Sequence, residues 1–293
     1  MDLDKIKSFL TLAKVKNFTK ASEELYISQP ALSKQIQSLE FELKAPLFDR
    51  IGKQTFLTVQ GEEFKRYAEQ MLNSYQNSLE HIRQIKNLEQ GRINFGATNF
   101  IGVYLMPHLI SKYNKLYPKI EINMTINSSK NILEMLHKNQ LEFSFVSNYI
   151  VDDEQKYEIH RFCHDTLKLI VGNSHPLFNR DSCTLDDLKD EIFITKNNKA
   201  SQSNFIREKL NQHGFEIKKS IIISHQEAIK ESVIHNVGVA FMSTKAIERE
   251  VQLGLIKSLD VENIILSREI NYLYEKSKNL TPAALKFLEM IKK

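Results

Sequence analysis

The chain has 293 residues, of which 42% are apolar and 26% charged, and its formal net charge at pH 7 is +4. At about 150 residues per domain this length predicts two domains, and the composition excludes disordered and fibrous proteins. Uncharged runs such as 94–111 are interrupted by polar residues, so no stretch reaches the roughly 18 apolar residues of a membrane span. The start, Met1–Lys5, lacks the basic and apolar regions of a secretory signal. We therefore expect a cytoplasmic protein without a membrane anchor.

Cysteine and glycine patterns argue against several chemistries. The two cysteines, Cys163 and Cys183, are too few for a disulfide framework and lack C-x-x-C spacing, which fits a reducing compartment. The nine glycines contain no G-x-G pair, so the dinucleotide fingerprint is missing. The sequence also contains no G-x-S-x-G, S-x-x-K or H-E-x-x-H motif. An enzyme is therefore disfavoured, and no cofactor is expected.

The positive charges are not concentrated in one segment. Residues 1–60 hold nine basic and seven acidic side chains, a local excess of only two cations. A protein that binds nucleic acid through bulk charge would show a larger excess, so any such binding must depend on a local surface.

Residues 19–40 predict two helices separated by a tight turn. Thr19 is the expected N-cap of a short helix over 20–25. Ser28 is the expected N-cap of a helix over 29–40, and Pro30 lies in its first turn, where its missing N–H costs nothing.

The two faces of the helix over 29–40 differ. Apolar residues recur at i, i+4 and i+7 and predict a buried stripe of Leu32, Ile36 and Leu39. The opposite face carries amide and hydroxyl groups that hydrogen-bond base edges, and one cation: Gln29, Ser33, Lys34 and Gln37. Such a helix after a short helix and a turn is typical of a helix-turn-helix that fits a major groove. Four polar residues alone more often form a solvated face, so the prediction depends on the wider pattern.

Five segments within residues 18–61 carry that wider pattern: Phe18–Leu25, Ser28–Ile36, Leu39–Glu40, Leu47–Arg50 and Leu57–Gly61. At this spacing they resemble the DNA-binding domain of LysR-type transcriptional regulators. The resemblance implies a winged helix-turn-helix whose third helix meets DNA, with Arg50 and Lys53 near the wing at the backbone or minor groove. The expected DNA-contacting residues are Thr19, Ser28, Gln29, Pro30, Ser33, Lys34, Gln37, Arg50 and Lys53.

Lys44 departs from the family pattern, which has glycine at this position after Leu43. A helix C-terminus often needs a left-handed residue, and a lysine there costs about 1 kcal/mol relative to glycine. The sequence therefore predicts modest strain at Lys44.

From Thr58, a further expected N-cap, apolar residues recur at steps of three and four and predict a long amphipathic helix. About 29 residues would extend roughly 40 Å, so the apolar stripe is expected to meet a partner chain, although packing within its own chain is the alternative. By resemblance this is the linker helix through which subunits pair, in a homodimer or homotetramer. The expected dimerisation residues are Phe64, Tyr67, Met71, Leu72, Tyr75, Leu79 and Ile82.

After Gly91, strands alternate with helices. The expected strands are 93–97, 120–126, 141–146, 166–171, 191–195, 217–223, 237–242 and 268–275. The expected helices are 103–117, 132–138, 203–212, 224–235, one from Thr244 and one opened by Thr281–Pro282, with a capping box over Ser224–Glu227. This alternation predicts an α/β fold of two doubly wound units with a cleft between them.

The same region resembles the effector-binding domain of the LysR family, which has the two-lobed fold of periplasmic binding proteins. Looser motifs carry this resemblance: Gly91–Gly96, Leu105–Pro107, Tyr117–Pro118, His175–Leu177, Gly238–Ala240 and Leu280–Ala284. The expected domains are the helix-turn-helix over 1–58, the linker helix over 59–88 and the effector domain over 91–293. Within the last, lobe I is expected at about 91–162 and 267–293 and lobe II at about 163–266.

Ligands in such folds bind at the carboxyl ends of strands, where helix N-termini offer free N–H groups. Hydroxyls, amides and one lysine at these positions suit a small anion such as a carboxylate. An ordinary loop role is the alternative for each residue taken singly. The expected effector-binding residues are Thr98, Asn99, Phe100, Asn127, Ser128, Ser129, Ser147, Asn148, Thr195, Lys196, Ser201, Met242 and Ser243.

The leading interpretation is a transcriptional regulator that binds double-stranded promoter DNA and a small anionic effector, with RNA polymerase as a further candidate partner. A redox- or metal-responsive regulator using His160, Cys163 and His164 is one alternative, although no fourth ligand is evident. A ligand-binding receptor without a regulatory role is another. An enzyme fused to a DNA-binding head is disfavoured by the missing motifs.

Overall fold

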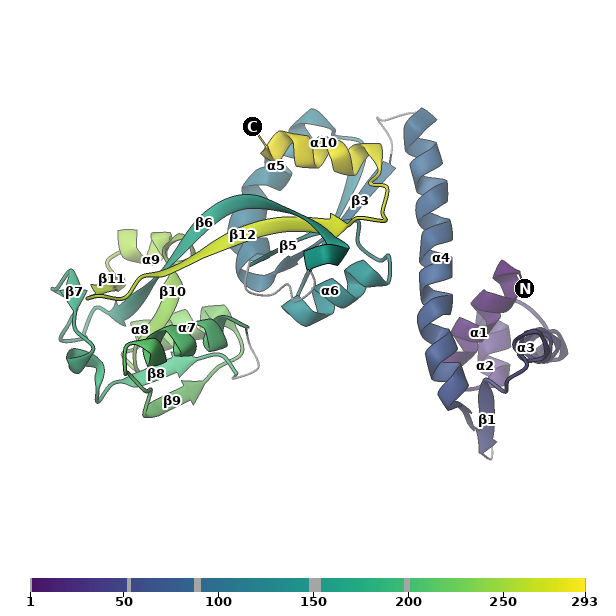
Figure 1. Cartoon of the computed structure of the whole chain (residues 1–293), viewed down its shortest axis with the longest axis horizontal. Helices are drawn as coiled ribbons and strands as arrows, with labels where there is room; N and C mark the ends of the chain where they lie inside the picture. Colours follow the sequence, from purple (N-terminus) through teal and green to yellow (C-terminus); the bar gives the residue numbers. More distant parts are fainter. Residues whose placement is uncertain (1, 52–53, 87–90, 148–153, 198–200, 293) are drawn as a thin grey trace. The chain divides into compact units, whose positions relative to one another are not determined.

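The computed structural model describes residues 2–51, 54–86, 91–147, 154–197 and 201–292 (Figure 1). They form two compact units, Met1–Gly91 with His137–Leu141 and Arg92–Leu136 with Glu142–Lys293. The first unit is helical apart from one small hairpin, and the second alternates strands with helices around a large sheet. This confirms the helical head and the α/β domain expected from the sequence.

The first unit contains α1 (Leu3–Val15), α2 (Phe18–Glu24), α3 (Gln29–Leu43), β1 (Phe48–Ile51), β2 (Gln54–Leu57) and the long helix α4 (Val59–Lys86). Its core is built from apolar side chains of α1, α2 and α3, among them the expected stripe of Leu32, Ile36 and Leu39. Strands β1 and β2 pair antiparallel, which is the hairpin that a winged helix-turn-helix requires.

Two of the expected helix caps are confirmed. The Ser28 hydroxyl accepts a hydrogen bond from the Ala31 N–H at 3.3 Å, with Pro30 in the first turn of α3. The Thr58 hydroxyl accepts from the Gly61 N–H at 2.9 Å and so caps α4. Both caps satisfy N–H groups that the helix itself leaves without partners.

The cap predicted at Thr19 is wrong. Helix α2 begins earlier, because the Asn17 side chain accepts from the Lys20 N–H at 3.0 Å and Phe18 packs against the core of the head. Thr19 is therefore a helical residue, and its carbonyl accepts from the Ser22 hydroxyl.

The second unit has strands from both of its sequence halves in one large sheet. Its strands are β3 (Gly91–Thr98), β4 (Ile120–Asn127), β5 (Phe143–Ser147), β6 (Tyr157–Gly172), β7 (Ser182–Cys183), β10 (Ala240–Ser243), β11 (Ile256–Val261) and β12 (Leu266–Glu275), with β8 (Ile192–Thr195) and β9 (Lys219–Ile222) as a separate parallel pair. The main order is β4-β3-β5-β12-β6-β11-β7, and β10 pairs with β6.

Helices cover these strands in two lobes. The helices are α5 (Met106–Leu116), α6 (Ser129–His137), α7 (Ser201–Gln212), α8 (Gln226–Ile234), α9 (Glu248–Gln252) and α10 (Pro282–Ile291), with short turns at η1 (Ile101–Leu105), η3 (Glu154–Lys156), η4 (Asp186–Leu188) and η5 (Thr244–Ala246). We call β3 to β5 with α5, α6 and α10 lobe I, and β7 to β11 with α7 to α9 lobe II. Figure 1 shows β6 and β12 running side by side from one lobe to the other.

The sequence pattern missed the first half of β6. A strand was expected over 166–171, but β6 is 16 residues long and pairs with β12 along ten register positions. Its first half mixes half-buried residues with exposed ones such as Arg161 and His164, so it lacks the apolar run that signalled the second half.

The capping box predicted over Ser224–Glu227 is also wrong. The N-cap of α8 is His225, whose side chain makes no capping hydrogen bond. The Glu227 carboxylate instead contacts Tyr104 and Lys230. A tertiary contact therefore replaces the local one that the sequence suggested.

Lys44 ends α3 in a left-handed conformation, with φ 53° and ψ 34°. We expect Lys44→Gly to raise the free energy of unfolding by about 1 kcal/mol, because glycine adopts this conformation without a Cβ clash. Urea unfolding of the full chain measures the change.

Lys44→Ala is the matched control, since alanine removes the lysine but keeps the Cβ atom. It should leave the stability close to that of the unchanged chain. Equal stabilisation by glycine and alanine would show that the lysine side chain, and not its backbone, causes the strain.

Candidate functional sites

The outward face of α3 is open to solvent. Gln29, Pro30, Lys34 and Gln37 are exposed and Ser33 is partly exposed, while the apolar stripe on the other side is buried. The expected base-reading groups therefore share one accessible helix face. Gln29 and Pro30 lie in the first turn of α3, where the helix dipole favours phosphate, and Ser33, Lys34 and Gln37 follow along the same face.

The other expected DNA-contacting residues are less fully described. Thr19 is exposed on α2, and Ser28 is exposed although its hydroxyl caps α3. The backbone of Arg50 lies in β1, but its side chain lies outside the described residues, as does all of Lys53.

Tyr26 is a surface residue that the sequence pattern did not indicate. It lies in the turn between α2 and α3, is 95% exposed and has φ 57°. Bulky residues rarely adopt a left-handed backbone, and such outliers gather at functional sites. The sequence does contain a sign of this residue's unusual position. An aromatic side chain stands just before Ile27 and the cap Ser28, in a turn that glycine or asparagine would form without strain.

The apolar stripe of α4 has two parts. Phe64 packs edge-on against Phe9 at 5.0 Å, and Phe64 and Met71 both cover the core of the head. The other residues of the stripe are more open: Tyr67, Tyr75, Leu79 and Ile82 are exposed, and Leu72 is half-buried. Seven expected dimerisation residues thus divide into two that stabilise the head, one intermediate residue and four that face solvent.

A pocket in lobe II lies at the carboxyl ends of β8 and β10, between the first turns of α7 and α8. It holds a cavity of about 30 Å³, and three of the expected effector-binding residues, Thr195, Lys196 and Met242, line it. The other lining residues are Phe193, Ile194, Gln202, Ser203, Ile206, Arg207, Ile217, Gln226, Ile229 and Phe241. The side chain of Ser201, a fourth expected residue, lies outside the described residues.

The charged side chains among these lining residues are cations only, Lys196 and Arg207. Burial, and then the charge of Arg268, lower the pKa of Lys196 below the ordinary value for lysine. The Lys196 carbonyl accepts a hydrogen bond from the Ser203 hydroxyl at 3.1 Å, which fixes the start of α7 against the end of β8.

Two more expected residues, Phe100 and Ser243, meet at a buried ion pair between β6 and β12. Arg268 and Asp165, 4% and 2% exposed, face each other across the strands with Nη2 and Oδ2 2.7 Å apart. The Ser243 hydroxyl donates to Asp165 at 2.5 Å, and the Phe100 ring covers the guanidinium at 4.8 Å. Both residues thus hold the crossing strands and do not line the lobe II pocket.

Some of the expected effector-binding residues of lobe I already make hydrogen bonds to residues close to them in the sequence. The Asn127 side chain accepts from the Ser128 N–H at 2.8 Å and from the Asn131 amide, and the Ser128 hydroxyl accepts from the Asn131 N–H. These contacts begin α6, whose first residue is Ser129. Thr98 and Asn99 are half-buried at the end of β3, Ser147 is buried at the end of β5, and Asn148 lies outside the described residues.

An interlobe network that the sequence did not reveal joins η1 to α8. The Tyr104 hydroxyl donates to the Glu227 carboxylate, and burial together with this bond raises the pKa of Tyr104 to about 12. The buried Lys230 ammonium lies 5.4 Å from the Tyr104 ring centre and pairs with Glu227 at 2.9 Å and Glu250 at 2.7 Å. These four side chains connect lobe I to lobe II beside the pocket.

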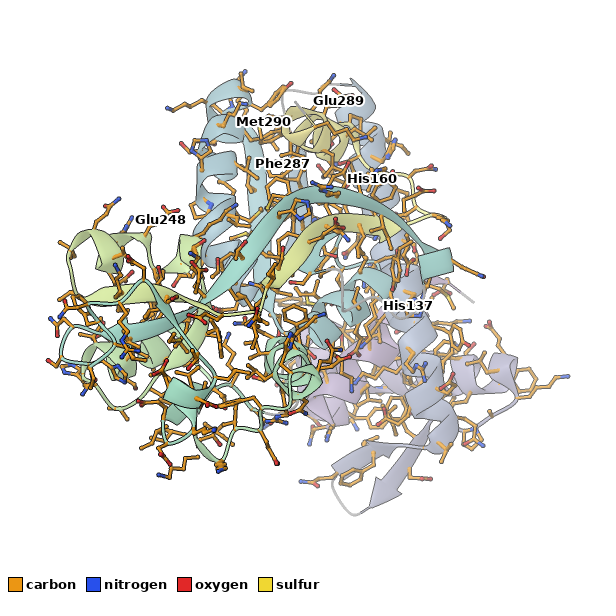
Figure 2. All side chains as sticks on the ribbon, turned by 60° about the vertical axis from the view of Figure 1, so that its left-hand side comes forward. His137, His160, Glu248, Phe287, Glu289 and Met290 are labelled. Atoms are coloured by element: carbon orange, nitrogen blue, oxygen red, sulfur yellow. The ribbon has the colours of Figure 1, made fainter. Side chains whose placement is uncertain are left out.

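The metal and redox alternative gains no support from the side chains around β6. Among the described residues, no three His, Cys, Asp or Glu side chains gather as a metal site. His160 on β6 (Figure 2) stacks on Tyr272 with ring centres 4.9 Å apart. Burial raises the pKa of Cys163, and burial raises that of Cys183 to about 11, so both thiols stay protonated at neutral pH.

Within the described part of the chain, no helix is long and apolar enough to cross a membrane.

A winged helix-turn-helix head joined to a two-lobed α/β domain defines the class of ligand-responsive helix-turn-helix regulators. Residues 3–62 match the family model of bacterial regulatory helix-turn-helix proteins, lysR family, and residues 86–293 match the LysR substrate binding domain. The chain belongs to the LysR family.

Three relatives illustrate the match. A "Probable RuBisCO transcriptional regulator" of Phaeodactylum tricornutum is 34% identical over 273 residues, which cover 92% of this chain and 89% of that protein. Full-length CbnR complexed with its target DNA has TM-score 0.76 at 19% identity, covering 100% and 99% of the two chains. The Synechocystis PCC6803 CcmR regulatory domain in complex with 2-PG has TM-score 0.62 at 20% identity, covering 69% and 96%. At these identities the two structures show a shared fold.

Tyr104→Phe tests the interlobe network. Losing a hydrogen bond to a charged carboxylate should lower the free energy of unfolding by about 1.5–3 kcal/mol. It should also speed amide hydrogen exchange in the first turn of α8, around Glu227 and Lys230, measured by mass spectrometry.

Tyr113→Phe is the matched control, because the Tyr113 hydroxyl donates to the Ala283 carbonyl at 2.8 Å inside lobe I. It should lower stability without affecting exchange in α8. Unchanged α8 exchange in Tyr104→Phe would mean that this network does not hold the lobes together.

Proposed function

We propose that this protein is a sequence-specific DNA-binding transcriptional regulator that works as a homodimer or homotetramer in the cytoplasm and responds to a small anionic effector. The observation that carries the proposal is the exposed polar face of α3 in a winged helix-turn-helix head that belongs to the LysR family. The domain limits expected from the sequence, 1–58, 59–88 and 91–293, are kept in this proposal, with lobe I over 91–162 and 267–293 and lobe II over 163–266.

The head reads DNA through α3. Amide and hydroxyl groups of Gln29, Ser33 and Gln37 suit base edges in the major groove, and Lys34 suits phosphate or guanine. Ser28 and Thr19 flank this face, and Arg50 and Lys53 are assigned to the wing. The CbnR structure, solved with target DNA, supports the same use of this head.

Tyr26 extends this surface. Its side chain is exposed directly before the cap of α3, next to Gln29 and Pro30 in the sequence. We assign it to the DNA backbone, where its ring packs on sugar and its hydroxyl donates to phosphate. Such a contact explains why a strained aromatic residue occupies the turn.

Pairing of heads follows from α4. Tyr67, Tyr75, Leu79 and Ile82 leave a long apolar stripe in contact with water, which a second copy of α4 would bury. A dimer presents two copies of α3 to two half-sites about one helical turn of DNA apart. Because the head carries few excess cations, one head alone should bind DNA weakly.

The effector is assigned to the cleft side of lobe II. Two cations and no carboxylate appear among the described residues that line the pocket, so the side chains favour an anion. Thr195, Lys196 and Met242 already line it, and Ser201 lies at the start of α7 beside it. Thr98 and Ser147 end strands of lobe I, and Asn99 and Ser128 directly follow such strands. These residues would complete the site from the opposite side.

Effector binding would control DNA binding by shifting the lobes. The Tyr104–Glu227 hydrogen bond crosses from one lobe to the other. The Asp165–Arg268 pair joins the two strands that connect the lobes. A ligand that binds one arrangement of the lobes more tightly changes the population of that arrangement. RNA polymerase is also part of the proposal, as a candidate partner, because a regulator bound at a promoter lies close to the polymerase.

Gln29→Ala tests the assignment of base-reading residues. It should reduce the preference for the cognate site over random DNA by about 1–3 kcal/mol, because a bidentate amide contact is lost. Mobility-shift titrations with the chain's own upstream region and with random DNA measure both affinities.

Lys53→Ala is the comparison, because a phosphate contact should weaken cognate and random DNA alike and reduce the salt dependence. Identical effects of both substitutions would refute the assignment. Binding that lacks any sequence preference and any salt sensitivity would refute the regulator itself.

A further inference from the structure

Gln226, one of the residues that line the lobe II pocket, has a buried amide oxygen that is not satisfied by a hydrogen bond from a described residue. Gln226 is 5% exposed, and its Oε1 has no hydrogen-bond partner among the described residues. Gln226 lies at the start of α8, which has no side-chain cap, and it lines the pocket beside Ile229. Buried polar atoms of folded proteins are nearly always paired, so this oxygen calls for a donor from a bound molecule.

One side of the pocket that Gln226 lines is apolar. Among its apolar lining residues are Phe193, Ile206, Ile217, Ile229, Phe241 and Met242. The cavity of about 30 Å³ is small. It accepts a short alkyl chain and excludes an aromatic ring.

The charges around the pocket decide which donor fits. Lys196 and Arg207 line it, and Arg268 lies close enough to Lys196 to lower its pKa further after burial has done so. An ammonium group would meet this positive wall without a carboxylate among the described lining residues to receive it. A hydroxyl brings the required donor without adding charge, and a carboxylate complements the cations.

We propose that the effector is a small hydroxy acid: a carboxylate held at Lys196, a hydroxyl that donates to Gln226 Oε1, and a short alkyl chain in the apolar pocket. The proposal rests on the proposed function, since it names the ligand class of the same cleft. Gln226 is then the residue that selects for the hydroxyl. Its oxygen is desolvated already, so a ligand hydroxyl gains a hydrogen bond at no further desolvation cost to the protein. An analogue without a donor lacks this gain and binds more weakly.

Matched ligand pairs test this proposal on the full-length chain. Two pairs are compared: 2-hydroxybutanoate with butanoate, and 2-hydroxy-3-methylbutanoate with 3-methylbutanoate. A fifth probe, 2-aminobutanoate, carries an ammonium group in place of the hydroxyl. Isothermal titration calorimetry should give a preference of about tenfold or more for each hydroxy acid over its plain partner. The amino acid should bind more weakly than the hydroxy acid of the same length.

Two substitutions make the test specific to Gln226. Gln226→Leu keeps the size of the side chain but removes the acceptor, so the preference for the hydroxy acid should fall to about twofold or less. Gln212→Leu, on the exposed end of α7, is the control and should keep the full preference. Circular dichroism and thermal melting confirm that both variants fold.

Three results would overturn the proposal: equal binding of hydroxy and plain acids, an unchanged preference in Gln226→Leu, or no binding of any probe. A mobility-shift assay on the ligand-free chain separates this failure from failure of the proposed function. Specific DNA binding with no hydroxy-acid binding overturns the ligand class alone, whereas hydroxy-acid binding without specific DNA binding overturns the regulator.

Discussion

The effector domain depends on one buried ion pair, in which the Arg268 guanidinium contacts the Asp165 carboxylate at 2.7 Å. The two residues face each other across β6 and β12, the strands that run between the lobes. Removing two charges from water costs several kcal/mol, and only close contact with additional hydrogen bonds recovers it. Ser243 supplies one such bond and the Phe100 ring covers the guanidinium. The pair therefore fixes the crossing strands together with one segment from each lobe.

The same pair influences a charged residue of the lobe II pocket. Asp165 neutralises Arg268 directly, yet Arg268 still adds to burial in lowering the pKa of Lys196. Burial and the nearby Arg268 thus disfavour the charged form of Lys196, and an anionic ligand beside it would stabilise that form. Tyr104 and Glu227 provide the second connection between the lobes, at the start of the helix that also carries Gln226. The proposed effector site and the contacts between the lobes therefore involve neighbouring groups.

The sequence predicted features that depend on near neighbours and missed those that depend on distant ones. The buried stripe on α3, the Ser28 cap and the left-handed Lys44 follow from spacing within one helix, and all three were confirmed. Asp165 and Arg268 are 103 residues apart, and Tyr104 and Glu227 are 123 apart, so no local pattern joins them. The strand-end rule did select Thr195, Lys196 and Met242, but the buried Gln226 lies on a helix, outside that rule.

A double-mutant cycle on the Asp165–Arg268 pair tests the central role of this interaction most directly. Urea unfolding of the full chain would compare Arg268→Met, Asp165→Leu and the double substitution. Each single change should cost about 3–5 kcal/mol, because it leaves one buried charge without its partner, and the double change should cost clearly less than the sum. Single changes that each cost under about 1 kcal/mol and simply add in the double variant would contradict the account.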